Sequence, residues 1–205
     1  WSDARQGRVI RRDLASGRET VLTPEAGKYL SPVFSPDGRQ VAYVKSRGGY
    51  LTAPWNGMDP GVYLVSADGK GEPRRITKDG EAPQFGADPG ELYVTRSKRS
   101  SEVDMPRLLV RIRLDTREET ELVKSEHASA FAVSPDGRWL GYTERFHTYL
   151  TPLPPSGKLL SVGPKAEAMP QRRLDLDAGD YLHWSGDSRG LHYALGNELF
   201  SVSTD

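Results

Sequence analysis

Four histidines are the residues of this chain best suited to metal binding or acid–base catalysis, and their spacing predicts neither. They stand at positions 127, 147, 183 and 192, so the chain has no His-x-His pair and no HExxH motif. His183 and His192 flank a predicted hairpin turn, where two imidazoles on neighbouring strands could share a metal ion, but a third ligand is not evident. We therefore predict no metal site and no cofactor, and expect both histidines to pack within a hairpin or at a sheet edge.

Serine residues with potential catalytic partners are expected to be structural as well. Ser35 and Ser134 hold the same place in two copies of a repeated turn, where the hydroxyl caps a local backbone group. A role that recurs in two repeats is structural rather than nucleophilic. Glu126-His127 stands near Ser129, but neighbouring residues on an extended chain point to opposite sides, so they do not form a triad. We predict no nucleophilic serine and no catalytic residue in this chain.

The acidic run 175–180, Asp-Leu-Asp-Ala-Gly-Asp, resembles the start of a calcium-binding loop. The bidentate glutamate that an EF-hand loop needs is missing, because Gly186 stands at that offset. Leu174 and Leu176 alternate with the acids, which is the pattern of an exposed strand. We therefore expect a short exposed strand within 172–177 and not a calcium site.

The clearest pattern in the chain is the motif Ser-Pro-Asp-Gly-Arg, which occurs twice between strand-like apolar runs. A proline followed by Asp-Gly gives a tight turn, and the glycine supplies the positive φ that a short hairpin connection needs. Asp37 with Gly38, and Asp136 with Gly137, are therefore predicted to shape two β-hairpins. The two aspartates cannot act as a carboxylate pair, because they are one full repeat apart.

Two weaker copies of the hairpin lie at 85–95 and 184–194, and equivalent turn positions are 52, 47 and 51 residues apart. A period near fifty residues indicates an array of β units. Four short strands can be counted in a repeat, which is the content of a propeller blade. The expected strands are 30–34, 40–46, 61–66 and 73–77 in the first full repeat, and 130–133, 139–144, 147–153 and 159–162 in the third.

The sequence therefore predicts an all-β fold, a β-propeller of four-stranded antiparallel blades. We expect a partial propeller of about four blades, because the chain starts with two strands of an earlier repeat, at 8–13 and 19–23, and stops after a third strand at 198–202. Either another segment or a second copy of the chain would complete the ring. The predicted domain is 1–205, divided into 1–23, a blade at 24–77, a blade at 78–123, a blade at 124–163 and an incomplete last blade at 164–205.

Composition limits the class of partner. The chain has 205 residues, of which 36% are hydrophobic, and this is enough to bury a core. Its 28 basic residues balance 28 acidic ones, so no broad electrostatic field favours nucleic acid or an anionic membrane. No apolar run is long enough to span a membrane, and the lack of cysteine excludes disulfides and thiolate sites. We expect a soluble segment that is periplasmic or secreted, with a cytoplasmic location still open.

The motif FSPDGR with an apolar strand on each side, followed by VYLVSADGKGEPRRIT, resembles the TolB-type, WD-like β-propeller repeat. Such repeats occur in TolB, in the tricorn protease, in prolyl-oligopeptidase-type peptidases and ahead of the catalytic domain in a group of bacterial amidohydrolases. The runs 128–152 and 179–200 are similar to the closing blades of those amidohydrolases. The resemblance implies a propeller that accompanies a metal-dependent hydrolase domain whose ligands lie elsewhere, and it specifies the fold better than the function.

Binding in propellers usually depends on the loops of one face. The connection 47–60 places large aromatic side chains among glycines and prolines, a composition suited to an interface or a ligand mouth. Packing of Trp55 against a blade edge is an equally good interpretation. The connections 98–106 and 163–180 should open on the same face. The candidate contact residues are Tyr50, Trp55, Asn56, Met58, His147 and Tyr149.

Three functions fit these features. In the preferred one, the chain is a non-catalytic propeller module that binds a protein, or gates a peptide or small-molecule substrate, for a linked hydrolase domain of the amidohydrolase or peptidase type. In the second, a loop residue contributes to substrate binding while a separate domain performs the hydrolysis. A free-standing periplasmic TolB-like protein that mediates protein interactions is the alternative, and it would show a signal peptide and complete blades. We expect no nucleic-acid partner and no membrane insertion, whereas self-association could complete the propeller.

Overall fold

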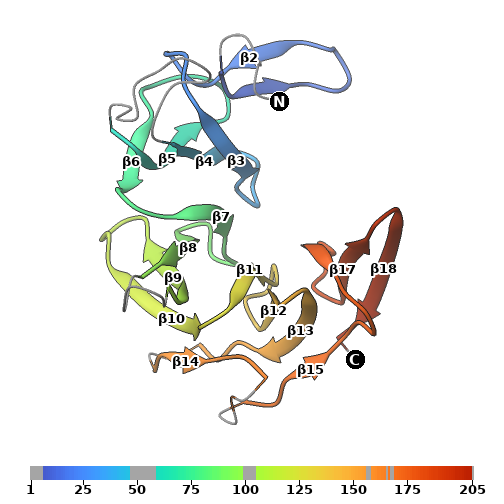
Figure 1. The fold of residues 1–205 in the computed structure, drawn as a ribbon. Coiled ribbons are helices and arrows are strands. Elements are labelled where there is room, and N and C mark those ends of the chain that lie inside the picture. Colours follow the sequence, from blue (N-terminus) through green and yellow to red (C-terminus); the bar gives the residue numbers. More distant parts are fainter. Residues whose placement is uncertain are drawn as a thin grey trace. The chain divides into compact units, whose positions relative to one another are not determined.

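A computed structural model describes residues 7–46, 59–98, 105–155, 158–164, 166 and 169–204 of the chain. All regular elements within these ranges are β-strands, eighteen in number, which confirms the predicted all-β class (Figure 1). The chain divides into two compact units, residues 1–85 and 86–205, and each is described by itself.

The first unit contains a hairpin and a four-stranded antiparallel sheet. In the hairpin, β1 pairs with β2, and in the sheet β3 to β6 pair in chain order. The strands expected for the first full repeat match β3 to β6 to within one residue at each end, so this predicted set of four strands is confirmed. The strands of the unit are β1 (Ile10–Arg12), β2 (Glu19–Val21), β3 (Tyr29–Phe34), β4 (Gln40–Lys45), β5 (Gly61–Ser66), β6 (Arg74–Thr77) and β7 (Glu81–Phe85).

Three tyrosines lie at the centre of the first unit's core. Tyr43 in β4 is 2% exposed, and its ring packs edge-on against Tyr29 and stacks on Tyr63, with centroid distances of 5.4 and 5.9 Å. Val9 and Leu22, next to the β1–β2 hairpin, are buried in the same cluster. Apolar packing therefore holds the hairpin to the sheet.

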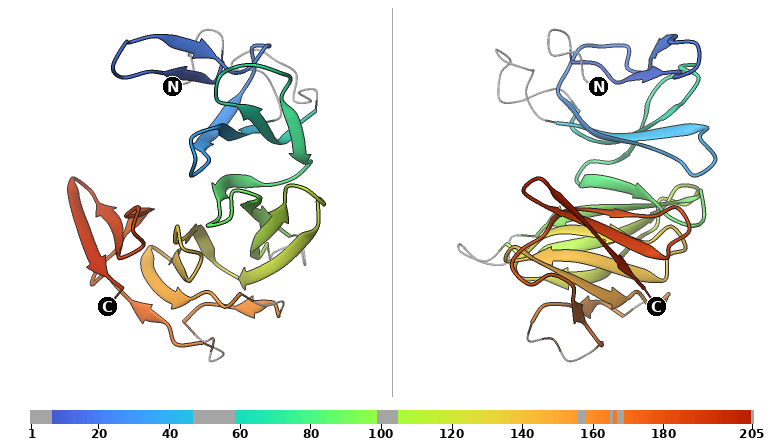
Figure 2. Two further views of the ribbon diagram at one scale, coloured as in Figure 1. Left: turned by 180° about the vertical axis from the view of Figure 1, so that it is seen from behind. Right: turned by 90° about the vertical axis from the view of Figure 1, so that its right-hand side faces the viewer.

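The second unit contains three sheets. β8 to β10 pair antiparallel in chain order, as do β11 to β13 and β16 to β18. The β16–β18 sheet lies beside β11 and β12, as Figure 2 shows. The strands are β8 (Glu91–Ser97), β9 (Arg107–Arg113), β10 (Glu119–Ser125), β11 (Ala128–Val133), β12 (Trp139–Glu144), β13 (His147–Pro152), β14 (Leu160–Ser161), β15 (Arg172–Arg173), β16 (Asp180–Trp184), β17 (Gly190–Leu195) and β18 (Glu198–Ser203).

The fourth strand of the third repeat is not the one that the sequence predicts. The expected strand at 159–162 contains β14, but β14 pairs in parallel with β10, with Val123 opposite Leu160. The strand that pairs antiparallel with β13 is β15, at the start of the run 172–177. Leu160 packs against the core cluster that contains Val123, and burial there outweighs the local hairpin pattern.

The repeated turns share one hydrogen-bond pattern. In the first, the Ser35 hydroxyl donates to the Asp37 carboxylate at 2.5 Å and accepts from the backbone N–H of Gln40 at 2.9 Å. The turn at 134–139 repeats both bonds at 2.6 and 2.9 Å, and the turn at 185–190 repeats them at 2.6 and 2.8 Å. The fourth residue of each turn has a left-handed backbone, with φ values of 69°, 72° and 64°. Side chain and backbone conformation thus act together to close each hairpin.

A second left-handed position lies four residues before the turn in three of the repeats. Ser31 in β3, Ala82 in β7 and Tyr181 in β16 have φ values of 49°, 46° and 56°. The pairing register shifts at this point in both β3 and β16. A register shift of this kind is typical of a β-bulge, which changes the direction of a side chain. In β16 the residue whose direction is changed is a tyrosine.

Candidate binding pocket

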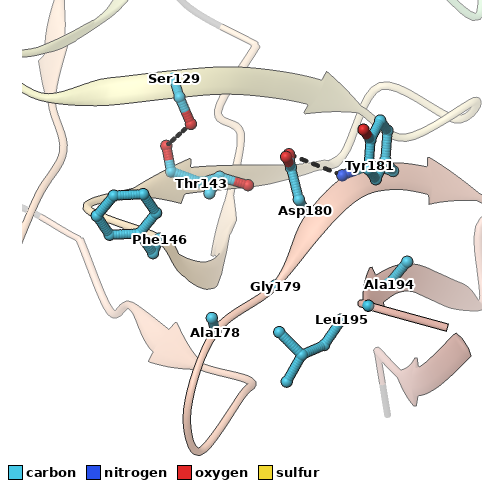
Figure 3. Close-up of a pocket in the computed structure, with 10 residues that line it drawn as sticks. Ser129, Thr143, Phe146, Ala178, Gly179, Asp180, Tyr181, Ala194 and Leu195 are labelled. Atoms are coloured by element: carbon cyan, nitrogen blue, oxygen red, sulfur yellow. Dashed lines mark hydrogen bonds between the residues drawn. The ribbon is translucent and has the colours of Figure 1, made fainter. Parts of the chain in front are cut away.

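A mostly apolar pocket of about 390 Å³ lies between the β11–β13 strands and the β16–β18 sheet (Figure 3). Its walls come from β11 and β12, from the turn between β12 and β13, from the segment that enters β16 and from the turn between β17 and β18. This volume lies within the range of small-ligand sites. The residues that matter most for its chemistry are Ser129, Thr143, Phe146, Asp180, Tyr181 and Leu195.

Phe146 is exposed by the turn that carries it. Arg145 and Phe146 form the two-residue connection between β12 and β13, with φ values of 49° and 72°. A hairpin turn with positive φ at both central positions usually contains Asn-Gly, so an arginine and a phenylalanine strain it. The Phe146 side chain is 80% exposed. Backbone strain that presents an aromatic ring to solvent points to binding rather than to packing.

Tyr181 enters the same pocket from the bulge in β16, and it is 81% exposed. The Asp180 carboxylate accepts a hydrogen bond from the Tyr181 backbone N–H at 2.8 Å, which stabilises the left-handed backbone at the bulge. Leu195 adds apolar surface from the β17–β18 turn. Two aromatic rings and one aliphatic side chain therefore line a single pocket.

Two polar groups accompany this apolar lining. Thr143 is 2% exposed, and its Oγ1 has no hydrogen-bond partner within the part of the chain that the structure describes. The backbone oxygen of Thr143 accepts a hydrogen bond from Ser129 Oγ at 3.3 Å. A buried hydroxyl without a partner costs about 1–3 kcal/mol. A ligand group that reached Thr143 Oγ1 would remove this cost.

His147 follows the Phe146 turn and bonds to a buried carboxylate. Its Nδ1 lies 2.8 Å from Asp175 Oδ1, and Asp175 also accepts hydrogen bonds from the Thr148 backbone N–H and, at 3.4 Å, from Arg173 Nε. The Asp175 side chain is 2% exposed, and burial alone would raise its pKa. These donors outweigh burial and hold the pKa of Asp175 below its usual value. The carboxylate thus ties the segment before β16 to β13.

A short exposed strand is present within 172–177, as the sequence predicts, but it does not extend into the acidic run. Within 172–177 only the first two residues are strand. Leu176 is 92% exposed and Asp175 is buried, which reverses the expected alternation. Asp175 can be buried because the N–H of Thr148 and the ring of His147 satisfy its carboxylate.

One Gly-x-Ser-x-Gly pattern is present at 186–190, although no nucleophilic serine was expected. Ser188 is 6% exposed and lies in a hairpin turn. Its Oγ accepts a hydrogen bond from the backbone N–H of Asp136 at 2.9 Å, and no described histidine bonds to it. Because a serine nucleophile needs a base within hydrogen-bond reach, this arrangement does not activate Ser188. The side chain instead connects the turns of two neighbouring repeats.

The residues that the sequence proposes as contacts do not come together at this pocket. Tyr149 in β13 is half-buried and stacks on Tyr142 at 5.1 Å between ring centroids, and His147 binds Asp175. Neither lines the pocket. The proposed residues that lie outside the described ranges are Tyr50, Trp55, Asn56 and Met58.

Phe146 and Tyr181 were missed, and the sequence carries a signal for the first of them. The strands expected at 139–144 and 147–153 leave only Arg145 and Phe146 to connect them. A two-residue connection without glycine or asparagine, which ends in an aromatic residue, marks a turn under strain. The sequence pattern offers no comparable signal for Tyr181.

The remaining histidines show no metal centre. His183 and His192 face each other across β16 and β17, as the predicted hairpin requires, and His192 Nδ1 lies 2.7 Å from Ser201 Oγ. No group of three His, Cys, Asp or Glu side chains is placed to hold a metal ion within the described ranges. The same ranges contain no helix that is long and apolar enough to cross a membrane.

No family model matches the sequence, and a search of the curated proteins finds no match. Solved structures do match. TolB from Acinetobacter baumannii is 18% identical with a TM-score of 0.69, over 98% of this chain and 47% of that chain. An oligogalacturonate lyase from Vibrio parahaemolyticus is 16% identical with a TM-score of 0.59, over 91% and 50%. A puromycin-hydrolyzing peptidase from Mycobacterium tuberculosis is 15% identical with a TM-score of 0.59, over 96% and 34%.

These likenesses confirm the predicted TolB-like β-propeller fold with antiparallel blades. At this level of identity they show the fold alone. The chain spans about half the length of the first structures that it matches, with 50%, 47% and 50% of those chains covered.

Proposed function

We propose that this chain is a non-catalytic propeller module that binds a peptide or protein segment through the apolar pocket, as an accessory or substrate-gating domain of a larger hydrolase of the amidohydrolase or peptidase type. The observation that carries the proposal is the pair Phe146 and Tyr181. Each ring is exposed from a left-handed backbone position, and both line one pocket.

The pocket favours an extended segment with an apolar side chain as its ligand. Aromatic side chains have only two χ angles, so they lose little conformational entropy when a ligand buries them. Asp180 adds a carboxylate, and Thr143 adds a hydroxyl that has no partner among the described residues; these groups suit the backbone N–H and C=O groups of such a segment. The combination of apolar anchors with a few polar groups is typical of a recognition site.

The absence of an activated nucleophile among the described residues favours binding over catalysis by the chain alone. Ser188 is engaged by a backbone N–H, and the His147–Asp175 pair has no serine bonded to it in the described ranges. The match to the mycobacterial peptidase covers nearly the whole of this chain but about a third of that one, 34%, which supports a module that works beside another domain. The likeness to TolB supports a periplasmic or secreted location.

Selection of a displayed random peptide library on the purified chain tests the binding role. We expect enriched peptides to share an aromatic or branched aliphatic residue. Affinity for a synthetic copy should fall about tenfold or more in Phe146→Ser and in Tyr181→Ser, since buried aromatic anchors commonly contribute 2 kcal/mol or more. The matched control is Leu176→Ser, because Leu176 is also exposed but does not line the pocket. Equal loss in all three variants would contradict the proposal.

A hydrolysis assay with nitrophenyl esters and peptide nitroanilides tests the non-catalytic part. The chain alone should show no turnover above buffer. Turnover that disappears in His147→Gln would mean that the His147–Asp175 pair acts as a base, and the chain would then be an enzyme in its own right.

A free-standing periplasmic TolB-like interaction protein is the second candidate, favoured by the match to TolB over 98% of this chain. The encoding reading frame separates the two. A downstream region with His-x-His and further His and Asp ligands, or with a nucleophilic serine motif after a strand, supports the hydrolase. A signal peptide with additional blades and no catalytic extension supports the free-standing protein.

A further inference from the structure

We propose that Glu144 forms a second binding site in the same unit, one that accepts a primary ammonium group. A separate cavity of about 370 Å³ shares the β12–β13 turn with the apolar pocket, and Arg145 lines this cavity where Phe146 lines the pocket. Other walls come from Glu126 and His127, which connect β10 to β11, from residues 161–164 and from Ala166.

Glu144 is a buried carboxylate with one oxygen unused. The residue is 4% exposed, and its Oε2 accepts a hydrogen bond from Ser125 Oγ at 2.8 Å. Ser125 Oγ in turn accepts from the N–H groups of His127 and Ala128 at 3.2 and 2.9 Å, so its single proton is committed to the carboxylate. Within the described ranges, Glu144 Oε1 has no hydrogen bond and no ion pair.

The wall beside this carboxylate is held in place by a glutamine. Gln171 Oε1 accepts from the Gly163 N–H at 3.1 Å, and Gln171 Nε2 donates to the carbonyl oxygens of Gly163 and Ala166 at 3.3 and 2.9 Å. A Cβ on Gly163 would lie 3.0 Å from Glu144 Oε2, and its φ of 138° favours glycine. The cavity next to Glu144 is therefore bounded by a fixed backbone.

Glu144 Oε1 is open to the cavity although the residue as a whole is buried, so a cationic ligand there would form an ion pair that bulk water screens little. Burial, and in addition the nearby Glu144 carboxylate, raises the pKa of Tyr142. The rim carboxylate of Glu126 already pairs with Lys124 at 2.6 Å, so the buried carboxylate is the one that lacks a described cation.

The acceptor oxygens at Glu144 favour an ammonium group over a guanidinium or a metal ion. A guanidinium binds a carboxylate through two parallel hydrogen bonds, but Ser125 occupies Glu144 Oε2. A calcium or magnesium ion needs about six oxygen ligands, more than this site offers. An ammonium group is a compact charge that needs one strong acceptor, and Glu144 Oε1 supplies it. Lysine side chains and peptide amino termini both carry this group.

The proposal does not depend on the apolar pocket, and small probes test it alone. In a titration followed by amide NMR shifts, n-butylammonium should bind with a Kd on the order of 1 mM, a value reachable for a ligand of this size. Butylguanidinium and n-butanol should bind at least about tenfold more weakly, because they lack the compact charge. Nα-acetyl-lysine amide and Nε-acetyl-lysine amide then distinguish a side-chain source from an amino-terminal one.

Glu144→Gln keeps the shape of the side chain and removes its charge, so it should weaken n-butylammonium about tenfold or more. The matched control is Glu126→Gln, which removes a rim carboxylate and should change affinity by about twofold or less. The titrations are repeated in a Lys165→Ala background, so that this lysine cannot compete for the site. Unchanged affinity in Glu144→Gln, equal binding of n-butanol, or no saturable shift in either background would overturn the proposal.

Discussion

Replacing Asp175 by asparagine should destabilise the chain at neutral pH by about 3 kcal/mol, since hydrogen bonds to a buried charged group contribute roughly 1.5–3 kcal/mol each and the amide keeps only one acceptor oxygen. The carboxylate accepts from the His147 ring, the Thr148 N–H and Arg173 Nε, and its side chain is 2% exposed, so solvent screening does not reduce the effect. For a chain of this length the melting temperature should fall by roughly 6–12 °C.

The destabilisation caused by Asp175→Asn should depend on pH. The pKa of Asp175 is lowered from 3.8 in the folded chain, because its donors outweigh the opposing effect of burial. A lowered folded pKa contributes stability above the unfolded pKa, and this contribution is lost as the pH falls through the folded pKa. The difference between wild type and Asp175→Asn should therefore be full at pH 7 and shrink below about pH 4.

Thermal and urea melts at pH 7, 5 and 3, followed by circular dichroism, measure the difference in stability between wild type and Asp175→Asn. Asp177→Asn is the matched control, because it removes the same charge two residues away from an exposed position and should leave the melt within about 1 °C. If Asp175→Asn melts like the control, or if its deficit is the same at pH 3 as at pH 7, the carboxylate does not hold this segment as argued.

Two further predictions concern the repeated turns. Gly137→Ala should lower the free energy of unfolding by about 1 kcal/mol, because φ is 72° there while the added Cβ meets nothing within 4 Å. The control is Gly186→Ala, a position that is equally open but has no positive φ, and it should be close to neutral in urea melts. Equal effects would contradict the backbone argument. Ser188→Ala should lower the free energy of unfolding by about 1 kcal/mol, because the N–H of Asp136 loses its acceptor. The amide hydrogen of Asp136 should also exchange faster with solvent. Unchanged exchange there would mean that water replaces the hydroxyl without cost.

The fold was readable from the sequence because its signals are local. Pro-Asp-Gly fixes a turn within five residues, and strand alternation fixes the two sides of the hairpin, so the strands around Gly38 and Gly137 were placed almost to the residue. The outer strand of the third repeat was not, because the choice between 159–162 and 172–173 depends on burial against another sheet.

The candidate site was less predictable for the same reason. The sequence predicted contact residues within 47–60 because this connection is rich in aromatic side chains, which composition alone reveals. Phe146 and Tyr181 become a site only when a strained turn and a bulge place them at one pocket, and Asp175 becomes buried only through donors on β13. Pairings between distant segments carry no local sequence pattern.

The turn at Arg145 and Phe146 separates the residues of two cavities, so mutations that change the length of this hairpin would affect both. Thr143 and Phe146 line the apolar pocket, whereas Glu144 and Arg145 line the separate cavity beside Glu144. Because side chains alternate along β12, inserting or deleting one residue there would exchange the two sets and place the carboxylate in the apolar pocket. A change in the length of this hairpin would therefore alter the linings of both cavities at once, whereas a substitution would alter one of them.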